Sequence, residues 1–201
     1  ASFWGSGGTA APWGTVNYHD TFNGTVWATS TNMSTGVFGS ASCGTSSDSM
    51  IMGGDGGVGD ATTDARTLCQ RWNGSSWSTS TGGTLNTARN FHAGGGKTSE
   101  AWVVSGAPTG GGNYTATSEN WNGTTWTNSS ANIIARGSCF GDGSLTEGWV
   151  TGGQKATGVS GTLLTTEHYD GTTWSAGASI TEQRNSGTGG GFGDRYNSGF
   201  V

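Results

Sequence analysis

Three arginines recur at one position of a repeated sequence and are the first candidates for chemistry. They are Arg89, Arg136 and Arg184. Guanidinium groups that converge on one pocket could bind a carboxylate through paired hydrogen bonds. However, a residue that recurs at a fixed place in a repeat usually belongs to the internal bonding of that repeat. We therefore expect these arginines to be structural, and we predict no catalytic residue among them.

The histidines and cysteines offer no second reactive arrangement. The three histidines occupy non-equivalent places in the repeat, and the three cysteines form no Cys-x-x-Cys pair. Neither spacing suits a transition metal, and the odd number of cysteines argues against a disulfide framework. We predict no side-chain metal site and no cofactor, and we expect free thiols that pack as small hydrophobic groups. These residues are His19, His92, His168, Cys43, Cys69 and Cys139.

The composition limits the classes of partner. The chain has 201 residues, 10% of them charged, and a net charge of −5, so no basic surface is available for nucleic acid or anionic lipid. No apolar run approaches the roughly 20 residues that cross a bilayer. Ten tryptophans argue for a folded chain despite the 40 glycines, because each buried aromatic side chain removes about 150–250 Å² from water. We therefore predict a globular protein that neither binds nucleic acid nor inserts into a membrane. The first residue is Ala1 rather than methionine, which indicates a processed product or a segment of a longer protein.

One short phrase occurs four times and indicates the elements that position these residues. It consists of an aromatic residue, Asn-Gly or Asp-Gly, two further residues and a tryptophan. It recurs about every 50 residues, a period typical of repeat folds. Asn-Gly between strand-like residues is a strong β-hairpin signal, because a type I′ turn needs a positive φ at both central positions. The four tryptophans are Trp27, Trp77, Trp126 and Trp174.

A two-residue turn predicts the pairing across each hairpin. It places Glu119 opposite Trp126, with Trp121 diagonal to it on the same face. We therefore expect a carboxylate or amide in each copy to accept a hydrogen bond from the indole N–H, while the two rings fill the space between sheets. The acidic or amide residues of the four copies are Asp20, Gln70, Glu119 and Glu167.

A second shared block completes the repeat. Residues 88–94 match residues 135–141, and residues 102–106 match residues 149–153 at the same separation. With no helical periodicity, each repeat contains four short strands. Gly-Gly at the end of the second strand, an aromatic residue ending the third and a tryptophan in the fourth resemble kelch repeats, which form blades of β-propellers. The fuller wording resembles the kelch-like arrays of long virion and surface proteins of phages and bacteria.

This resemblance predicts an all-β fold in one domain, residues 1–201. The expected architecture is a four-bladed β-propeller of four-stranded antiparallel blades, with one blade closed by both termini so that no sheet edge stays open. A monomer is expected, and an eight-bladed dimer is the alternative. One conflict is visible, because Phe3-Trp4 duplicates the role of Phe200-Val201. The predicted blades are residues 33–82, 83–131 and 132–183, and residues 184–201 together with 1–32.

The loops between the second and third strands are the predicted recognition elements, because they differ between repeats while the strands do not. Variable loops on a rigid framework commonly bind partners. We expect a non-catalytic module that binds a protein or glycan, in a phage virion or on an extracellular bacterial surface. A glycan-active enzyme resembling sialidases and a ligand-free structural spacer are the alternatives. The candidate ligand-binding residues are Trp13, Asp60, Tyr114 and Lys155.

Overall fold

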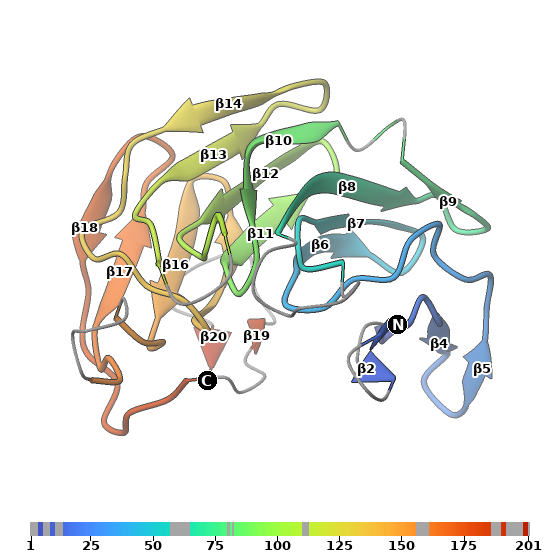
Figure 1. Cartoon of the computed structure of the whole chain (residues 1–201), viewed down its shortest axis with the longest axis horizontal. Coiled ribbons are helices and arrows are strands. Elements are labelled where there is room, and N and C mark those ends of the chain that lie inside the picture. The colour runs from blue at the N-terminus through green and yellow to red at the C-terminus, as the bar shows by residue number, and fades with distance from the viewer. Residues whose placement is uncertain are drawn as a thin grey trace.

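The computed structural model describes an all-β chain, and no helix occurs among the described residues (Figure 1). The all-β class predicted from the sequence is therefore confirmed. The described residues are 4–5, 9–10, 14–56, 65–79, 81, 83–109, 113–155, 161–185, 190–191 and 199–200.

Three large antiparallel sheets occupy the middle of the chain, and each begins as a meander in which consecutive strands pair. In the first sheet β9 and β10 both pair with the edge of β8 that β7 leaves free, β9 at Arg71 and Trp72 and β10 at Arg66 and Leu68. The strands of the first sheet are β6 (Ala41–Thr45), β7 (Asp48–Met52), β8 (Arg66–Trp72), β9 (Trp77–Ser78) and β10 (Thr84–Arg89). Those of the second are β11 (Ala93–Lys97), β12 (Glu100–Val104), β13 (Ser118–Trp121) and β14 (Trp126–Ser129). Those of the third are β15 (Phe140–Ser144), β16 (Glu147–Thr151), β17 (Thr166–Tyr169) and β18 (Trp174–Ala176).

Smaller sheets lie towards the two ends of the chain. The N-terminal part contains β1 (Trp4–Gly5), β2 (Thr9–Ala10), β3 (Gly14–Thr15), β4 (Asp20–Phe22) and β5 (Trp27–Thr29). Here β1, β4 and β5 form one sheet, while β2 and β3 form another. Near the C-terminus, β19 (Gly190–Gly191) pairs with β20 (Gly199–Phe200).

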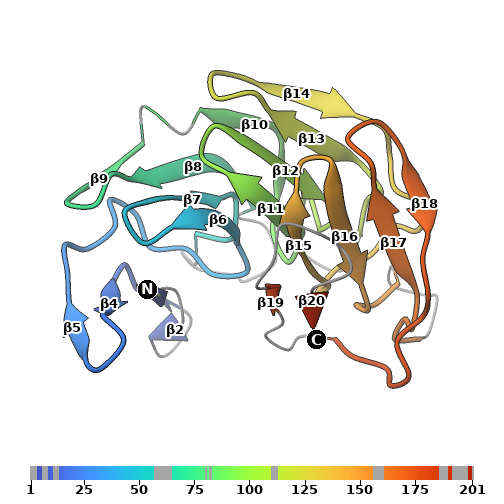
Figure 2. The ribbon, with the colours of Figure 1, turned by 180° about the vertical axis from the view of Figure 1, so that it is seen from behind.

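The large sheets are arranged around a common centre, with their first strands innermost (Figures 1 and 2). β11 lies between β6 and β15, and β19 lies beside β15. The sheet of β1, β4 and β5 is at one end of the resulting arc. β17 and β18 are towards the other end, with β19 and β20 between these ends.

The predicted closure of one sheet by both termini is not found among the described residues. The strands at the two ends form separate sheets. β1 pairs with β4 so that Gly5 lies opposite Asp20, the place that Val103 has opposite Glu119. The N-terminal segment thus occupies the position that the sequence also offered to Phe200, and β20 pairs with β19 instead.

The predicted register of the repeated hairpin is wrong. Trp121 lies opposite Trp126, and Glu119 lies opposite Asn128, so the loop has four residues rather than two. The reason is the Asn122 side chain, whose Oδ1 accepts hydrogen bonds from the backbone N–H groups of the residues two and three positions later. This Asx-type capping stabilises a longer turn in which Gly123 has a φ of 91° and the asparagine keeps a negative φ.

The hydrophobic core lies between neighbouring sheets. Trp121 and Trp126 of the second sheet pack with Met50, Met52 and Cys69 of the first. In the next cluster, Tyr169 and Trp174 of the third sheet pack with residues of the second, and the repeat tryptophan makes an edge-on contact with Trp102 at 5.5 Å between ring centres. The repeated hairpins therefore join adjacent sheets, as expected, although through a different register.

Candidate functional site

The glutamates of the second and third large sheets, Glu119 and Glu167, each bind the segment that enters their sheet. The Glu119 carboxylate accepts hydrogen bonds from the backbone N–H of Asn86 at 2.6 Å and of Thr87 at 3.1 Å. It also accepts one from Nη2 of Arg89 at 2.7 Å, and both side chains of this ion pair are 1% exposed. β10, which contains these donors, pairs with β8 of the preceding sheet. The carboxylate therefore fastens one sheet to the next, and it does not face the indole as the sequence suggested.

The arginine of this pair is bonded to the backbone as well. Nη1 of Arg89 donates to the carbonyl oxygens of Ser105 at 2.8 Å and Thr117 at 3.0 Å. Burial lowers the pKa of the Arg89 guanidinium, and the hydrogen bond that it donates to Glu119 opposes that shift. We call this arrangement of arginine, carboxylate and two backbone N–H groups the inter-repeat clamp. Both terminal nitrogens of its arginine are bonded inside the protein, and the buried side chain is not offered to a ligand.

The third sheet repeats the clamp. Glu167 accepts hydrogen bonds from the backbone N–H groups of Ile133 and Ile134, and it pairs with Nη2 of Arg136. Nη1 of this arginine donates to the carbonyl oxygens of Gly152 at 3.0 Å and Thr165 at 2.9 Å. Two successive seams between sheets are thus held by the same buried ion pair.

The first large sheet has a neutral version. Val37 stands where the other repeats have arginine, and Gln70 stands where they have glutamate. The Gln70 Oε1 accepts from the backbone N–H of Thr35 at 2.9 Å, and its Nε2 donates to the carbonyl oxygen of the same residue at 2.8 Å. Loss of the positive partner is therefore matched by loss of the negative one.

The last pair, Asp20 and Arg184, is not joined among the described residues. The Arg184 carbonyl oxygen accepts from the Gly153 N–H at 2.8 Å, as the Arg89 and Arg136 carbonyls accept from Gly54 and Gly106. Its backbone is thus placed like the others, but its side chain is exposed, and Asp20 is half-buried.

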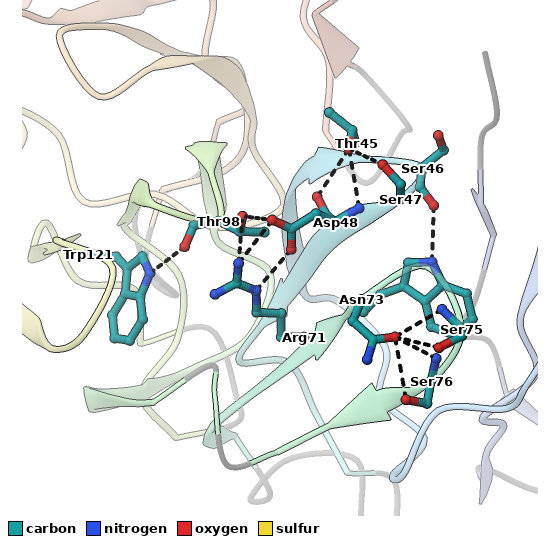
Figure 3. A network of polar contacts seen from close by, with 11 residues as sticks. Thr45, Ser46, Ser47, Asp48, Arg71, Asn73, Ser75, Ser76, Thr98 and Trp121 are labelled. Carbon is teal, nitrogen blue, oxygen red and sulfur yellow. Dashed lines mark hydrogen bonds and ion pairs between the residues drawn. The ribbon is translucent and has the colours of Figure 1, made fainter.

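One face of the arc carries uniform short turns. The indole N–H of Trp121 donates to the Thr98 carbonyl at 2.9 Å, at the turn between β11 and β12 (Figure 3). Trp72 makes the equivalent bond to the Ser46 carbonyl at 3.0 Å, at the turn between β6 and β7. These turns lie beside the four-residue hairpins. A Cβ placed on Gly123 would be only 3.0 Å from the Ser99 carbonyl oxygen.

An ion pair that sequence reasoning missed also lies on this turn face. Arg71 binds both carboxylate oxygens of Asp48 at 2.9 Å, and the Thr98 hydroxyl donates to the same carboxylate at 2.5 Å (Figure 3). The hydrogen bond from Arg71 holds the pKa of Asp48 below its usual value. Both side chains of the pair are partly exposed, so this ion pair contributes less to the stability of the fold than the buried clamps do.

The opposite face carries the variable loops, and each starts with the same backbone device. Two consecutive residues with positive φ end the second strand of every large sheet, and the second of them donates its N–H to the backbone of the following repeat. These two left-handed residues turn the chain out of the sheet at equivalent places. The pairs are Gly53 and Gly54, Ser105 and Gly106, and Gly152 and Gly153.

The predicted ligand-binding residues have different positions. Trp13 and Asp60 lie outside the described residues. The ring of Tyr114 covers the backbone of Gly137 in the next repeat, where a Cβ would lie 1.9 Å from its Cε1, so this tyrosine packs between loops. Lys155 is exposed on the loop that follows the third sheet's second strand.

Sequence reasoning also missed a polar cluster at the base of these loops. Asn90 donates from Nδ2 to Asp55 at 3.0 Å, and both residues are fully buried. His92 is buried nearby against Gly53 and Gly106, and its ring nitrogens have no hydrogen-bond partner within the described part of the chain. Burial, aided by the charge of Arg89, lowers the pKa of His92 to about 3. No local motif signals this cluster, because its members come from different repeats.

The cysteines are free thiols, as expected from their spacing. Burial raises the pKa of Cys69 to about 12 and that of Cys139 to about 11, and it raises that of Cys43 further. These thiols are therefore protonated at neutral pH and are poor nucleophiles. Over the described ranges, no group of three or more His, Cys, Asp or Glu side chains could hold a metal ion. None of those residues forms a helix of the length and apolarity needed to cross a membrane.

Comparisons with known proteins identify the fold but not a family. No protein-family model matches the chain. No curated protein matches it either. The solved structure of YjhT is similar, with a TM-score of 0.74 at 12% sequence identity. The similarity covers 92% of this chain and 70% of that chain. At this identity, the likeness concerns the fold alone.

Proposed function

We propose that this chain is a non-catalytic, kelch-like β-propeller module that recognises a protein or glycan through the variable loops of one face. The large sheets are its blades. The predicted four-bladed ring and its eight-bladed alternative use the same blades and differ only in what completes the blade that contains β4 and β5. In the phage or bacterial surface protein that the repeats resemble, such a module would display the loops on a rigid disc.

One observation carries this proposal: equivalent pairs of residues with positive φ direct loops of unrelated sequence out of the same face. The first residues of these pairs, Gly53, Ser105 and Gly152, have φ values of 61°, 66° and 62°, and each is followed by a glycine with a positive φ. The following loops share neither length nor side chains. A framework that is repeated and loops that are not is the arrangement expected of a binding surface.

The arginines support a binding module over the sialidase-like alternative. Arg89 and Arg136 are buried in the clamps, where they bond to backbone carbonyls and carboxylates of the protein itself. A substrate carboxylate could reach these guanidinium groups only by breaking the seams. The protonated thiols likewise supply no nucleophile at neutral pH.

A glycan array and a screen of candidate surface proteins, each run with variants of the loop face, test this function. Substitution of Trp13, Tyr114 or Lys155 by alanine should reduce binding at least tenfold with no change in unfolding temperature for Trp13 and Lys155. Lys97→Ala, a variant of the exposed turn face, is the matched control and should bind normally. Turnover of a glycan by the wild-type chain would contradict the proposal. Binding that Lys97→Ala abolishes and the loop variants leave intact would also contradict it.

A further inference from the structure

The repeated hairpins combine a reactive dipeptide with a polar cap. Asparagine followed by glycine occupies the turn in three copies, at Asn23, Asn73 and Asn122, and each of these asparagines is exposed. The fourth copy has Asp170 at the same place, followed by Gly171. An asparagine side chain loses ammonia when the backbone nitrogen of the next residue attacks its Cγ atom, and glycine hinders that attack least because it has no Cβ.

The fold requires the glycine that makes these asparagines reactive. The glycines of the four turns have φ values between 91° and 100°, a range that other residues rarely adopt. A side chain on Gly123 would also come too close to the Ser99 carbonyl oxygen. The residue that the turn needs is therefore the one that leaves the preceding side chain most open to attack.

The cap of each turn is arranged to stabilise negative charge on the asparagine oxygen. Oδ1 of Asn73 accepts hydrogen bonds from the backbone N–H groups of Ser75 and Ser76, both at 2.9 Å. Oδ1 of Asn122 accepts two at the same distance from the residues at equivalent places. Two backbone N–H groups that point at one oxygen form the arrangement that stabilises the oxyanion during acyl transfer. The turn thus favours the negatively charged intermediate of this attack.

The fourth copy shows that the turn accepts the product. The Asp170 carboxylate accepts from the backbone N–H groups of Thr173 at 2.7 Å and Thr172 at 2.8 Å, as the asparagines do from theirs. These hydrogen bonds, that from Thr173 above all, lower the pKa of Asp170, so the site favours a charged oxygen. An isoaspartate would not keep this cap, because its backbone is one methylene longer and its carboxylate is attached directly to Cα.

We infer that the Asn-Gly turns deamidate in the folded protein and give mainly aspartate, the residue that the fourth repeat already has. The backbone nitrogen of Gly123 loses its proton and bonds to Cγ of Asn122, while the cap holds the developing charge on Oδ1. The Cγ–Nδ2 bond then breaks, and ammonia leaves with that proton, so that a five-membered succinimide remains. Water adds at Cγ, the carbonyl that the cap polarises. Its hydroxyl stays on the new carboxyl group, its proton goes to the glycine nitrogen, and the ring opens to aspartate.

The conversion changes the charge of the hairpins and leaves the loop face as it is. Each event adds one negative charge to a chain whose net charge is already −5. The hairpins lie beside the turn face, and the recognition loops keep their residues. This modification is independent of what the loops bind, so either proposal can fail without the other.

Peptide mapping by mass spectrometry after incubation at pH 8 and 37 °C tests this modification. In the folded wild type, the peptides that contain Asn73 and Asn122 should gain about 1 Da at least fivefold faster than the peptide that contains Asn128. Asn128 is also exposed but is followed by serine. Electron-transfer fragmentation, which separates aspartate from isoaspartate, should show aspartate as the main product. In guanidinium chloride the cap is lost, and isoaspartate should predominate.

Two variants of one turn complete the test. Asn122→Gln is the matched control, because its longer side chain would have to close a six-membered ring. It should abolish the mass gain at this position and leave that at Asn73 unchanged. Asn122→Asp, the expected product, should have the unfolding temperature of wild type at pH 7. Mainly isoaspartate in the folded protein, a rate at Asn73 and Asn122 no higher than at Asn128, or a less stable Asn122→Asp chain would each overturn the inference.

Discussion

Two seams of this molecule solve one packing problem with different chemistry. The seam between the first and second large sheets contains a buried ion pair, Arg89 with Glu119, and the buried imidazole of His92. The preceding seam has Val37 and Gln70 at the clamp positions, and Ser40 stands where the next repeat has the histidine. Both seams satisfy the backbone of the entering segment. The hydrogen bonds are therefore the constant requirement, and the charge is an optional means of making them.

The difference also shows that the charges are exchanged as a pair. A buried ion is tolerated when its partner and its hydrogen bonds are present, and it is strongly destabilising alone. A repeat that lost its arginine would leave a buried carboxylate, so the change to an amide restores neutrality. Variants that combine one charged residue with one neutral residue at the clamp positions should consequently be less stable than either natural pair.

The largest effect is expected when the charged clamp loses one partner. Glu119→Leu leaves the Arg89 guanidinium buried without its carboxylate, and it removes the acceptor of two backbone N–H groups. We expect a loss of about 3–5 kcal/mol in the free energy of unfolding, measured by urea denaturation.

The double variant Arg89→Val with Glu119→Gln copies the neutral seam and separates charge from size. It should be at least about 2 kcal/mol more stable than Glu119→Leu, because no unpaired charge remains. Asp48→Asn, at the partly exposed pair of the turn face, is the matched control and should cost about 1 kcal/mol or less. A double variant less stable than the single one would show that the two seams are not interchangeable.

The second-largest loss of stability is expected when a charge is introduced into the neutral seam. Gln70→Glu places a carboxylate beside Val37, where no arginine compensates it, and we expect a loss of about 3 kcal/mol at pH 7. Burial would raise the pKa of this introduced carboxyl above its unfolded value of about 4.3. The loss should therefore grow as the pH rises from 4 to 7 in urea denaturation series. Adding Val37→Arg should recover part of the stability, and a pH-independent loss would contradict this explanation.

His92 should make the charged seam sensitive to acid. Its folded pKa of about 3 lies below the unfolded value of about 6.5, so the unfolded chain takes up a proton first as the pH falls. The stability contribution is complete above about pH 6.5 and is lost towards pH 3, with a slope near 1.4 kcal/mol per pH unit for one proton. At pH 5 the expected loss is about 2 kcal/mol relative to pH 7.

His92→Ser, which copies Ser40 of the neutral seam, identifies the group responsible for this acid sensitivity. The variant should lose the one-proton slope between pH 6.5 and 4 in the same denaturation series. His168→Ser is the control, because that side chain is only half-buried. An unchanged slope in His92→Ser would assign the acid sensitivity to other groups.

Much of this fold was predictable because it is periodic. The four tryptophans located the hairpins, and their spacing placed the strands of each repeat near their observed positions. The register was not predictable from the Asn-Gly signal, since the length of the turn depends on where the Asn122 oxygen finds its hydrogen bonds. A two-residue turn and a side-chain-capped four-residue turn share that sequence and differ in every pairing.

The sequence predicted only the arginine side of the clamp. The recurrence of Arg89 and Arg136 indicated a structural role, but their partners were not assigned, because the pairing spans about 30 residues and crosses a seam. A signal was present in the exchange of both partners in one repeat, Val37 for arginine and Gln70 for glutamate. Asp55 and Asn90 gave no such signal, because their bond occurs once and has no copy to compare.

The smallest effect is expected in the repeated turn, where a charged residue again replaces a neutral one. Asp170 stands where the other hairpins have asparagine, and its carboxylate accepts from the backbone N–H groups of Thr172 and Thr173. These hydrogen bonds, with that from Thr173 the largest contribution, lower the pKa of Asp170. A depressed carboxyl pKa stabilises the fold above the unfolded value of about 3.9, and this contribution disappears as the pH falls through the folded value. Asp170→Asn should leave stability at pH 7 almost unchanged and remove this acid-dependent part. NMR titration of the Asp170 carboxyl measures its pKa, and unfolding curves at pH 2, 4 and 7 measure the acid-dependent stability. An unshifted titration would contradict this explanation and show that the aspartate turn resembles the asparagine turns only in shape.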